Sequence, residues 1–192
     1  MRLGIFGGSF DPPHLGHLLA ASDALEHLAL DRIVCVPAAT QPLKAGRSVA
    51  NADQRLEMVR LLVEGDDRFE VSPVEVERKG LSFTVDTLEH FAAAHPSAER
   101  FLLVGADVLE TFPQWRQPER VLQLARLVVL ERAGDHVSLP AGVDGAAVTR
   151  LPTRRIDVSS TEIRERVRAG RSIRGFVTDA VAAYIGRCGL YR

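Results

Sequence analysis

Short apolar runs alternate along the chain with stretches in which apolar residues recur every three or four positions. The runs predict buried β-strands, and the periodic stretches predict amphipathic helices. The predicted strands span residues 2–6, 32–37, 69–77, 100–104, 126–130 and 147–151. The predicted helices span residues 17–30, 51–64, 84–95 and 178–186, with shorter helices after Pro118 and Ser159. This alternation predicts an α/β fold, a doubly wound parallel sheet with helices on both faces.

Several residues indicate where these elements begin, end or break. Pro73 interrupts the pattern of residues 69–77, because proline has no N–H to donate within a sheet. Asn51 followed by Gln54 resembles a capping box at a helix start. Thr84 is expected to cap the helix that follows it.

Length and composition are those of an ordinary globular domain. The chain has 192 residues, 46% hydrophobic and 26% charged, without a repeat, low-complexity segment or linker. We therefore expect a single domain, residues 1–192, with a small C-terminal helical part, residues 155–192. A net charge of −1 gives no general attraction to nucleic acid or to an anionic membrane, so any anion site must be local. The sequence has neither an apolar run long enough to span a membrane nor a signal stretch, which predicts a cytoplasmic protein.

The two cysteines, Cys35 and Cys188, form neither a C-x-x-C pair nor a metal-ligand spacing. Cys35 lies within a predicted strand and is expected to be a reduced thiol in the core. We therefore predict no metal site made by the protein itself.

The first predicted strand ends in a loop that contains two glycines, two prolines and two histidines. Gly7 and Gly8 let another molecule approach the main chain, and Pro12 and Pro13 exclude helix until about Gly16. A strand, a glycine loop and a helix start in this order place free N–H groups against a phosphate. The glycine spacing differs from the G-x-G-x-x-G dinucleotide fingerprint, and two glycines alone would indicate only a tight turn.

His14 and His17 are three residues apart and lie on either side of this helix start. Both imidazoles can therefore point into the same phosphate cradle. Imidazole donates to phosphate oxygens and gains positive charge as negative charge builds on them. A lone histidine is more often an incidental surface residue, but the complete run of residues 7–17 disfavours that interpretation.

Residues 7–17, Gly-Gly-Ser-Phe-Asp-Pro-Pro-His-Leu-Gly-His, resemble the G-G-x-F-D-P-x-H-x-G-H signature of the HxGH nucleotidyltransferase superfamily. This run is called the first signature below. Members of the superfamily have a Rossmann-like fold, transfer a nucleotidyl group from a nucleoside triphosphate to a phosphate, and release pyrophosphate. The resemblance implies that His14 and His17 are catalytic and that Ser9 contacts the acceptor. It implies ATP binding by Gly7, Gly8, Phe10, Gly16 and His17. The signature alone does not choose between adenylyltransferases and cytidylyltransferases.

A second signature, Val-Ser-Ser-Thr-Glu-Ile-Arg, occupies residues 158–164. Hydroxyl groups at a helix start cap it and expose N–H groups to an anion, and Arg164 adds a bidentate phosphate donor. A hydroxyl cap is common in any helix, but this run is similar to the superfamily's I-S-S-T-x-I-R, which binds the triphosphate opposite the first signature. The resemblance implies a catalytic role for Arg164. It implies ATP contacts from Ser159, Ser160, Thr161 and Arg164.

Two further segments resemble the bacterial nicotinate mononucleotide adenylyltransferases. Residues 80–88, Gly-Leu-Ser-Phe-Thr-Val-Asp-Thr-Leu, are similar to the segment that holds the pyridine end of the substrate. The resemblance implies contacts from Ser82 and Thr84, although spacing alone indicates only a helix start. In the family, a tryptophan that corresponds to Trp115 stacks on the pyridine, whereas a lone tryptophan is more often a core anchor.

A Gly-Ala-Asp run follows the strand predicted at residues 100–104, as it does in that family. Gly105 permits close approach of a ligand, and Asp107 can accept hydrogen bonds from a ribose, so the resemblance implies that both bind ATP. A carboxylate that caps the next helix explains Asp107 equally well.

The polar loop of residues 38–50 contains one lysine, Lys44, and a loop lysine is usually only solvated. The family often has Pro-His-Lys here, and this chain has Pro-Leu-Lys, so it keeps the cation and lacks the histidine. The resemblance implies that Lys44 is a catalytic cation that also contacts the acceptor. Arg132, in a partial match to a family Arg-Pro-Gly, is implied as another acceptor contact.

Together these resemblances imply an enzyme that joins AMP from ATP to nicotinate mononucleotide, giving deamido-NAD and pyrophosphate in NAD biosynthesis. Its partners would be these two small molecules, with Mg²⁺ accompanying ATP, and neither nucleic acid nor membrane. The acceptor phosphate is itself a nucleophile, so positioning and charge stabilisation are enough. Three points stay open: an acceptor other than the nicotinate nucleotide, such as the nicotinamide nucleotide; a non-catalytic nucleotide sensor; and whether the protein is a homo-oligomer.

Overall fold

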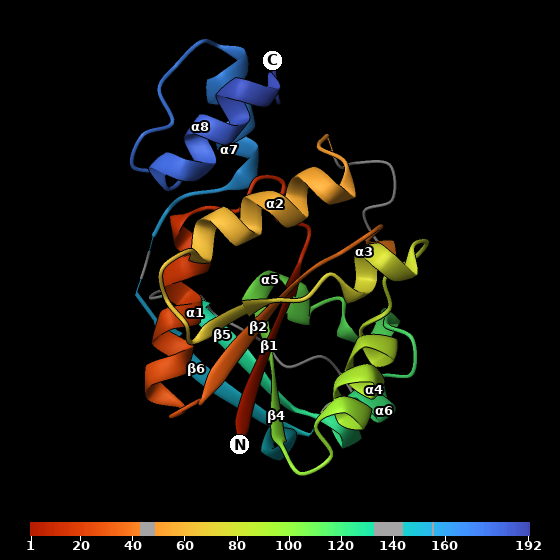
Figure 1. Ribbon diagram of the computed structural model, residues 1–192. Helices are drawn as coiled ribbons and strands as arrows, with labels where there is room; N and C mark the ends of the chain where they lie inside the picture. The colour runs from red at the N-terminus through yellow and green to blue at the C-terminus, as the bar shows by residue number, and fades with distance from the viewer. Residues whose placement is uncertain (43–48, 133–143, 155) are drawn as a thin grey trace.

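The computed structural model describes residues 1–42, 49–132, 144–154 and 156–192. The described residues form a six-stranded parallel sheet of order β3-β2-β1-β4-β5-β6 (Figure 1). Its strands are β1 (Arg2–Gly8), β2 (Arg32–Pro37), β3 (Phe69–Val71), β4 (Glu99–Gly105), β5 (Arg126–Arg132) and β6 (Val148–Thr153). This order confirms the doubly wound sheet, and its winding direction changes between β1 and β4.

Alternate residues of each strand pack against opposite helical layers. In β4, Phe101 and Leu103 join one buried cluster, while Leu102 and Val104 join the other. The first layer contains α1 (Leu15–His27), α2 (Ala52–Val63), α7 (Ser160–Arg168) and α8 (Asp179–Cys188). The second contains α4 (Thr84–Ala94), α5 (Ala106–Leu109), the 3-10 turn η2 (Phe112–Gln114) and α6 (Pro118–Leu124). Both faces of the sheet are therefore covered, as the continuous apolar runs predict.

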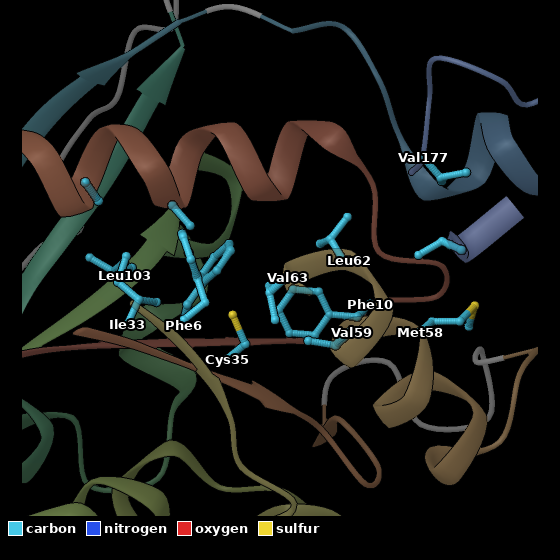
Figure 2. Close-up of a cluster of buried hydrophobic side chains, with 14 of the residues drawn as sticks. Phe6, Phe10, Ile33, Cys35, Met58, Val59, Leu62, Val63, Leu103 and Val177 are labelled. Atoms are coloured by element: carbon cyan, nitrogen blue, oxygen red, sulfur yellow. The ribbon is translucent and has the colours of Figure 1, made fainter. Parts of the chain in front are cut away.

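The C-terminal helices share the core of the first layer. Leu103 and Phe6 of the sheet lie at one end of a buried cluster, which continues past Cys35 and Val63 of α2 to Val177 between α7 and α8 (Figure 2). Cys35 is a free buried thiol, as predicted, and burial raises its pKa to about 12. No helix within the described ranges is long and apolar enough to cross a membrane.

The capping box at the start of α2 is confirmed. The Asn51 side chain accepts from the Gln54 N–H at 2.8 Å, and the Gln54 side chain accepts from the Asn51 N–H at 3.0 Å. The edge strand β6 also lies where it is predicted, after the 3-10 turn η3 (Gly145–Ala147). At these places the local chemistry and the fold favour the same structure.

The strand predicted beyond Pro73 is wrong. β3 ends at Val71, and α3 (Val74–Arg78) follows, with Pro73 at its N-cap position. Proline cannot continue the ladder, and the carbonyl of Pro73 accepts instead from the Glu77 N–H at 2.8 Å. The helical turn buries the side chain of Glu75, which accepts from the Thr87 hydroxyl at 2.5 Å.

Thr84 is not the cap of α4. Phe83 occupies the N-cap position, and its carbonyl accepts from the N–H groups of Asp86 and Thr87 at 3.2 and 3.4 Å. Thr84 is therefore the first helical residue. Its side chain makes no capping bond and instead lines a cavity.

Candidate active site

A cavity of about 890 Å³ lies at the carboxyl ends of β1 and β4. Ligands of open α/β sheets bind at this position, where the direction of winding changes. The described residues that the sequence predicts as site residues all line it: Gly7, Gly8, Ser9, Phe10, His14, Gly16, His17, Ser82, Thr84, Gly105, Asp107, Trp115, Ser159, Ser160, Thr161 and Arg164. Lys44 and the side chain of Arg132 lie outside the part of the chain that the structure describes.

The two histidines stack at the start of α1, and we call this part of the cavity the histidine end. Their ring centroids are 3.7 Å apart, and the His17 ring also contacts the edge of Phe10 at 5.1 Å. The main-chain N–H of His14 donates to Nδ1 of His17 at 3.2 Å. Because that nitrogen accepts, the neutral His17 ring carries its proton on Nε2, which is then its ring donor.

Gly16 allows this histidine pair to form. A Cβ atom at Gly16 would lie 3.0 Å from Nδ1 of His14 and 3.9 Å from the Val158 carbonyl oxygen. A side chain there would press against the His14 ring, whereas its contact with the segment that leads into α7 would be an ordinary van der Waals one. Glycine at this position thus lets the His14 ring lie where it does.

Direct hydrogen bonds join the two signatures. The Arg164 guanidinium donates from Nη1 to the main-chain oxygen of Asp11 at 2.7 Å, across 153 residues of sequence. The Ser160 hydroxyl donates to the main-chain oxygen of Pro12 at 2.8 Å. Ser159 caps α7 by accepting from the Glu162 N–H at 3.1 Å. The N-terminus of α7 therefore faces the same cavity as the histidines, where an anion is favoured.

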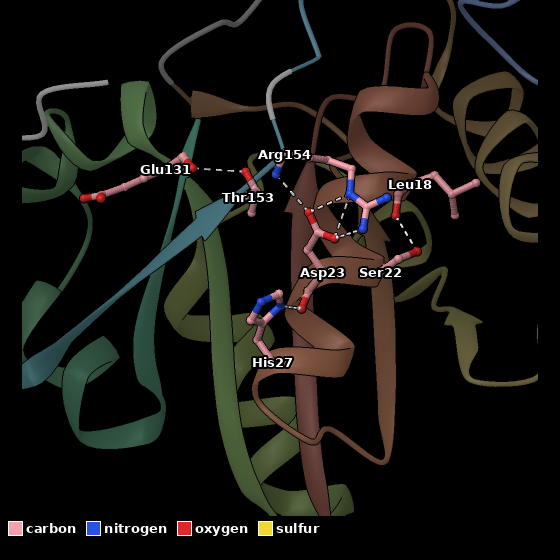
Figure 3. Close-up of polar contacts among 7 residues, drawn as sticks. All are labelled: Leu18, Ser22, Asp23, His27, Glu131, Thr153 and Arg154. Atoms are coloured by element: carbon pink, nitrogen blue, oxygen red, sulfur yellow. Dashed lines mark hydrogen bonds and ion pairs between the residues drawn. The ribbon is translucent and has the colours of Figure 1, made fainter. Parts of the chain in front are cut away.

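The chain that leads from the sheet to α7 is anchored on α1. Figure 3 shows Arg154, just after β6, bound to the buried carboxylate of Asp23 by its main-chain N–H at 3.0 Å and by its side chain at 2.8 Å. Thr153 donates to the Glu131 carbonyl at 3.2 Å and fixes the end of β6 to β5. Asp23 and His17 lie on the same helix, so α1 carries the last residues of the first signature and also holds the segment that leads to the second.

At the junction of β4 and α5, Gly105 is the N-cap of α5 and Asp107 lies within its first turn. The alternative in which Asp107 caps this helix is therefore wrong, because the glycine occupies that position. A Cβ atom at Gly105 would lie 2.6 Å from Oδ1 of Asp107, so glycine is needed for this carboxylate position. The Asp107 side chain is exposed at the edge of the cavity and has acceptor oxygens.

The part of the cavity lined by Ser82, Thr84 and Trp115 is called the tryptophan end. Trp115 is half-buried rather than a core anchor, its Nε1 donates to the Thr111 hydroxyl at 3.1 Å, and its ring lies 5.3 Å from that of Phe112. The Ser82 hydroxyl accepts from the Ala39 N–H at 2.9 Å. The indole is thus held by its own segment and lines the cavity.

Glu75 is an unpredicted acidic residue at the tryptophan end. It lines the cavity and is 7% exposed. Burial raises its pKa above the ordinary value, while hydrogen bonds from Thr87 and Ser82 and the charge of Arg78 oppose that shift. The helix α3, which replaces the strand expected beyond Pro73, is what brings this carboxylate to the cavity.

Three other residues of the site have no role in the sequence-based prediction. Asp11 is buried within the first signature, Arg55 is buried on α2, and Gln41 accepts from the Ser9 hydroxyl at 2.6 Å. Asp11 lies within a recognisable motif, so its sequence position was a signal. Arg55 looks like any charged residue of an amphipathic helix and has no comparable signal.

Comparisons with known proteins match this chain along its whole length. The cytidylyltransferase-like family model matches residues 5–166. A Gemmatimonas aurantiaca protein is 55% identical over 197 residues, covering 100% of this chain and 93% of that protein. A Thermus thermophilus protein is 46% identical over 195 residues, covering 100% of both. Both carry the name "Probable nicotinate-nucleotide adenylyltransferase".

Solved structures show the same fold. Plasmodium falciparum nicotinic acid mononucleotide adenylyltransferase complexed with NaAD has a TM-score of 0.77 at 18% identity, covering 99% of this chain and 97% of that chain. The same enzyme complexed with APC has a TM-score of 0.75 at 18% identity, covering 99% and 96%. With the family model and the relatives, the chain belongs to the cytidylyltransferase-like proteins and, within them, to the nicotinate-nucleotide adenylyltransferase family.

Proposed function

We propose that this chain transfers AMP from ATP to nicotinate mononucleotide and releases pyrophosphate, a step of NAD biosynthesis. The observation that carries the proposal is the pair of hydrogen bonds from Arg164 and Ser160 to the loop of the first signature. They bring two phosphate-binding features to one cavity, and the relatives at 55% and 46% identity bear the name of this activity.

The reaction needs positioning and charge stabilisation. A phosphate oxygen of the nicotinate nucleotide attacks the α-phosphorus of ATP, a new P–O bond forms, and the bond to the β-phosphate oxygen breaks as pyrophosphate leaves. The acceptor oxygen is already nucleophilic, so no covalent enzyme intermediate is required. His17 Nε2, His14 and Arg164 stabilise the charge that builds on the phosphates, and the N–H groups of α7 bind the triphosphate.

The cavity fits a divalent cation that arrives on ATP. Among the described residues, no group of three or more His, Cys, Asp or Glu side chains is arranged to hold a metal ion. Asp107 and Glu110 are exposed carboxylates on its lining. A hard ion such as Mg²⁺ keeps most of its ligands as water and phosphate oxygens, so one or two such carboxylates are enough. When bound, it supplies charge neutralisation for the pyrophosphate group.

The tryptophan end receives the pyridine. Trp115 supplies a stacking face, and the N–H groups of Thr84 and Val85 at the start of α4 precede the first hydrogen bonds to the Phe83 carbonyl. Such donors satisfy a carboxylate, which only accepts, better than an amide. Glu75 also lies at this end, where burial raises its pKa above the ordinary value. Lys44 and Arg132 are further proposed acceptor contacts, supported by the resemblance alone.

The test measures pyrophosphate release from ATP with a panel of phosphate acceptors. We expect release with nicotinate mononucleotide and a kcat/KM well above that for the nicotinamide nucleotide, by up to roughly 10⁴-fold if unpaired polar groups decide the choice. A ratio of the two kcat/KM values near one would contradict the nicotinate assignment, but the assignment as an adenylyltransferase would stand. ATP binding without turnover on any acceptor would instead identify a nucleotide sensor.

A further inference from the structure

We propose that Tyr191 is a positioning residue for the transfer, which acts through Asp11 on the first signature and on the Arg164 that docks against it. The proposal rests on the function proposed above and assigns a role to the C-terminal segment. Tyr191 is not one of the described residues that line the cavity, and its hydroxyl donates to Asp11. Its influence on the reacting groups must therefore pass through that carboxylate.

Asp11 is a buried carboxylate with three hydrogen-bond donors. It is 4% exposed, and its Oδ2 accepts from the Val49 N–H at 2.8 Å. Its Oδ1 accepts from the Ala50 N–H at 3.1 Å and from the Tyr191 hydroxyl at 2.8 Å. Hydrogen bonds to an ionised acceptor are among the stronger ones in proteins, and a lost partner leaves a buried charge unsatisfied. The orientation of this carboxylate therefore depends on Tyr191.

Tyr191 reaches Asp11 from the other end of the chain. The two residues are 180 positions apart, and Tyr191 is 3% exposed at the end of the segment that follows α8. Its ring packs in the same cluster as Met58 of α2, and Thr178, the N-cap of α8, donates to the Leu61 carbonyl at 3.4 Å. Burial and the charge of Asp11 raise the pKa of Tyr191, so the phenol remains a donor at all ordinary pH values.

The main chain of Asp11 holds the second signature. Its carbonyl oxygen accepts from Arg164, and the next carbonyl, that of Pro12, accepts from Ser160. Nearby, the N–H of Leu15 at the start of α1 donates to the Phe176 carbonyl at 2.9 Å. A shift of Asp11 would therefore move the anchor of Arg164 together with the loop that leads into α1.

Arg55 holds the other side of this loop. Its buried guanidinium donates to the carbonyl oxygens of Ser9 at 2.7 Å, Ala39 at 2.9 Å and Ala50 at 3.3 Å. Burial lowers the pKa of Arg55, and the negative charge of Asp11 opposes that shift. With Arg55 fixed from α2 and Tyr191 from the C-terminal segment, the Asp11 carboxylate lies between two elements to which we assign no direct role in binding substrate.

The main test compares Tyr191→Phe with the matched control Tyr184→Phe, which removes the hydroxyl of the other tyrosine of the chain, on α8. Phenylalanine keeps the packing of the ring and removes only the donor. We expect kcat to fall about tenfold in Tyr191→Phe, while the Kd for ATP from calorimetry changes less than about threefold. The control should keep kcat within about twofold of wild type. Both are measured well below the Tm of each variant.

A double-mutant cycle with Asp11→Asn tests the route of the effect. If Tyr191 acts through Asp11, Tyr191→Phe should lower kcat less than about threefold in the Asp11→Asn background. Full additivity of the two losses would overturn the proposal. So would a kcat of folded Tyr191→Phe that matches wild type, or a weaker ATP Kd with unchanged kcat.

Hydrogen exchange separates this proposal from the proposed function, because it needs no turnover. Tyr191→Phe should speed amide exchange in the peptide of residues 9–17 and leave a β5 peptide unchanged. Unchanged exchange at residues 9–17 would overturn the positioning role. Faster exchange there in a protein with no adenylyltransferase activity would support the coupling and contradict the enzyme assignment.

Discussion

At the histidine end of the cavity, Arg164 and Ser160 are held by hydrogen bonds between the two ends of the chain, whereas at the tryptophan end the hydrogen bonds of Trp115 and Ser82 span only 4 and 43 residues. Arg164 reaches Asp11 across 153 residues, and Ser160 reaches Pro12 across 148. Trp115, in contrast, is held by Thr111 only four residues away. The two ends therefore differ in how far a local change spreads.

This difference suits the two tasks that we propose. In-line transfer requires the reacting groups to be fixed to a fraction of an ångström, which a network across the whole fold supplies. Stacking of a pyridine on an indole tolerates small shifts, since its energy depends weakly on exact position. Variants at the histidine end should therefore lower kcat or stability, and variants at the tryptophan end should alter acceptor affinity.

The largest effect is expected from Arg55→Met. The change removes a positive charge that acts on the buried Asp11 and leaves three carbonyls without their Arg55 donor. Losing a buried charge together with its hydrogen bonds costs about 3–5 kcal/mol of unfolding free energy. Urea unfolding measures it, with Arg60→Met, an exposed position on the same helix, as the control. An equal loss of unfolding free energy in both variants would show that the histidine end does not depend on Arg55.

His17→Ala should reduce kcat by about a hundredfold or more, the scale of a lost donor to developing charge. The Tm should change little, because the half-buried ring faces the cavity. The control is His27→Ala, an exposed histidine at the end of the same helix. Steady-state turnover decides the matter, and near-normal kcat in the variant would exclude His17 from the chemistry.

Trp115→Ala should raise the KM for the pyridine nucleotides by about twofold to tenfold, the value of one aromatic contact. The kcat and the preference for nicotinate should change less, because stacking does not distinguish an acid from an amide. Trp115→Phe, which keeps an aromatic face, should have a KM much closer to that of the wild type. If kcat fell and KM did not, the two ends of the cavity would not differ as we infer.

The smallest effect is expected from Glu75→Gln, and it should appear only above the ordinary carboxyl pKa. Glu75 has a raised pKa in the folded state, so the folded protein binds this proton more tightly than the unfolded chain. The stability of the wild type should then decline relative to Glu75→Gln as pH rises above about 4.5 towards the raised pKa. Glutamine keeps the acceptor for Thr87. Urea unfolding across this pH range measures the difference in unfolding free energy between the two proteins. A difference that does not change with pH would contradict a raised pKa of Glu75.

The sequence predicts the histidine end better because its residues are contiguous in two short runs. Each run joins a strand or loop to a helix start, where an anion is favoured, and each resembles a signature of the superfamily. The tryptophan end combines residues from α3, α4 and the segment after η2, and one of these elements, α3, was expected to be a strand. Alternating Val74 and Val76 resemble a strand, and only the packing of Glu75 against Thr87 shows otherwise.

The residues that support the site are the ones that sequence patterns do not reveal. Arg55 lies among polar and apolar residues at helical spacing, and nothing local shows that its guanidinium is buried. Tyr191 donates to a residue 180 positions away. Periodicity and caps describe neighbours along the chain, so a contact of this range becomes visible only when the fold is known.

The attachment of Arg154 to Asp23, across 131 residues, has a consequence for folding. Contacts of such long range are slow to form, because closing the intervening loop costs conformational entropy. Strands β2 to β6 lie between these two residues, and the cavity lining comes from β1, β4 and the start of α7, so it is complete only when these distant segments have come together. ATP bound at the proposed site should therefore stabilise the whole molecule against unfolding by mass action, rather than one loop.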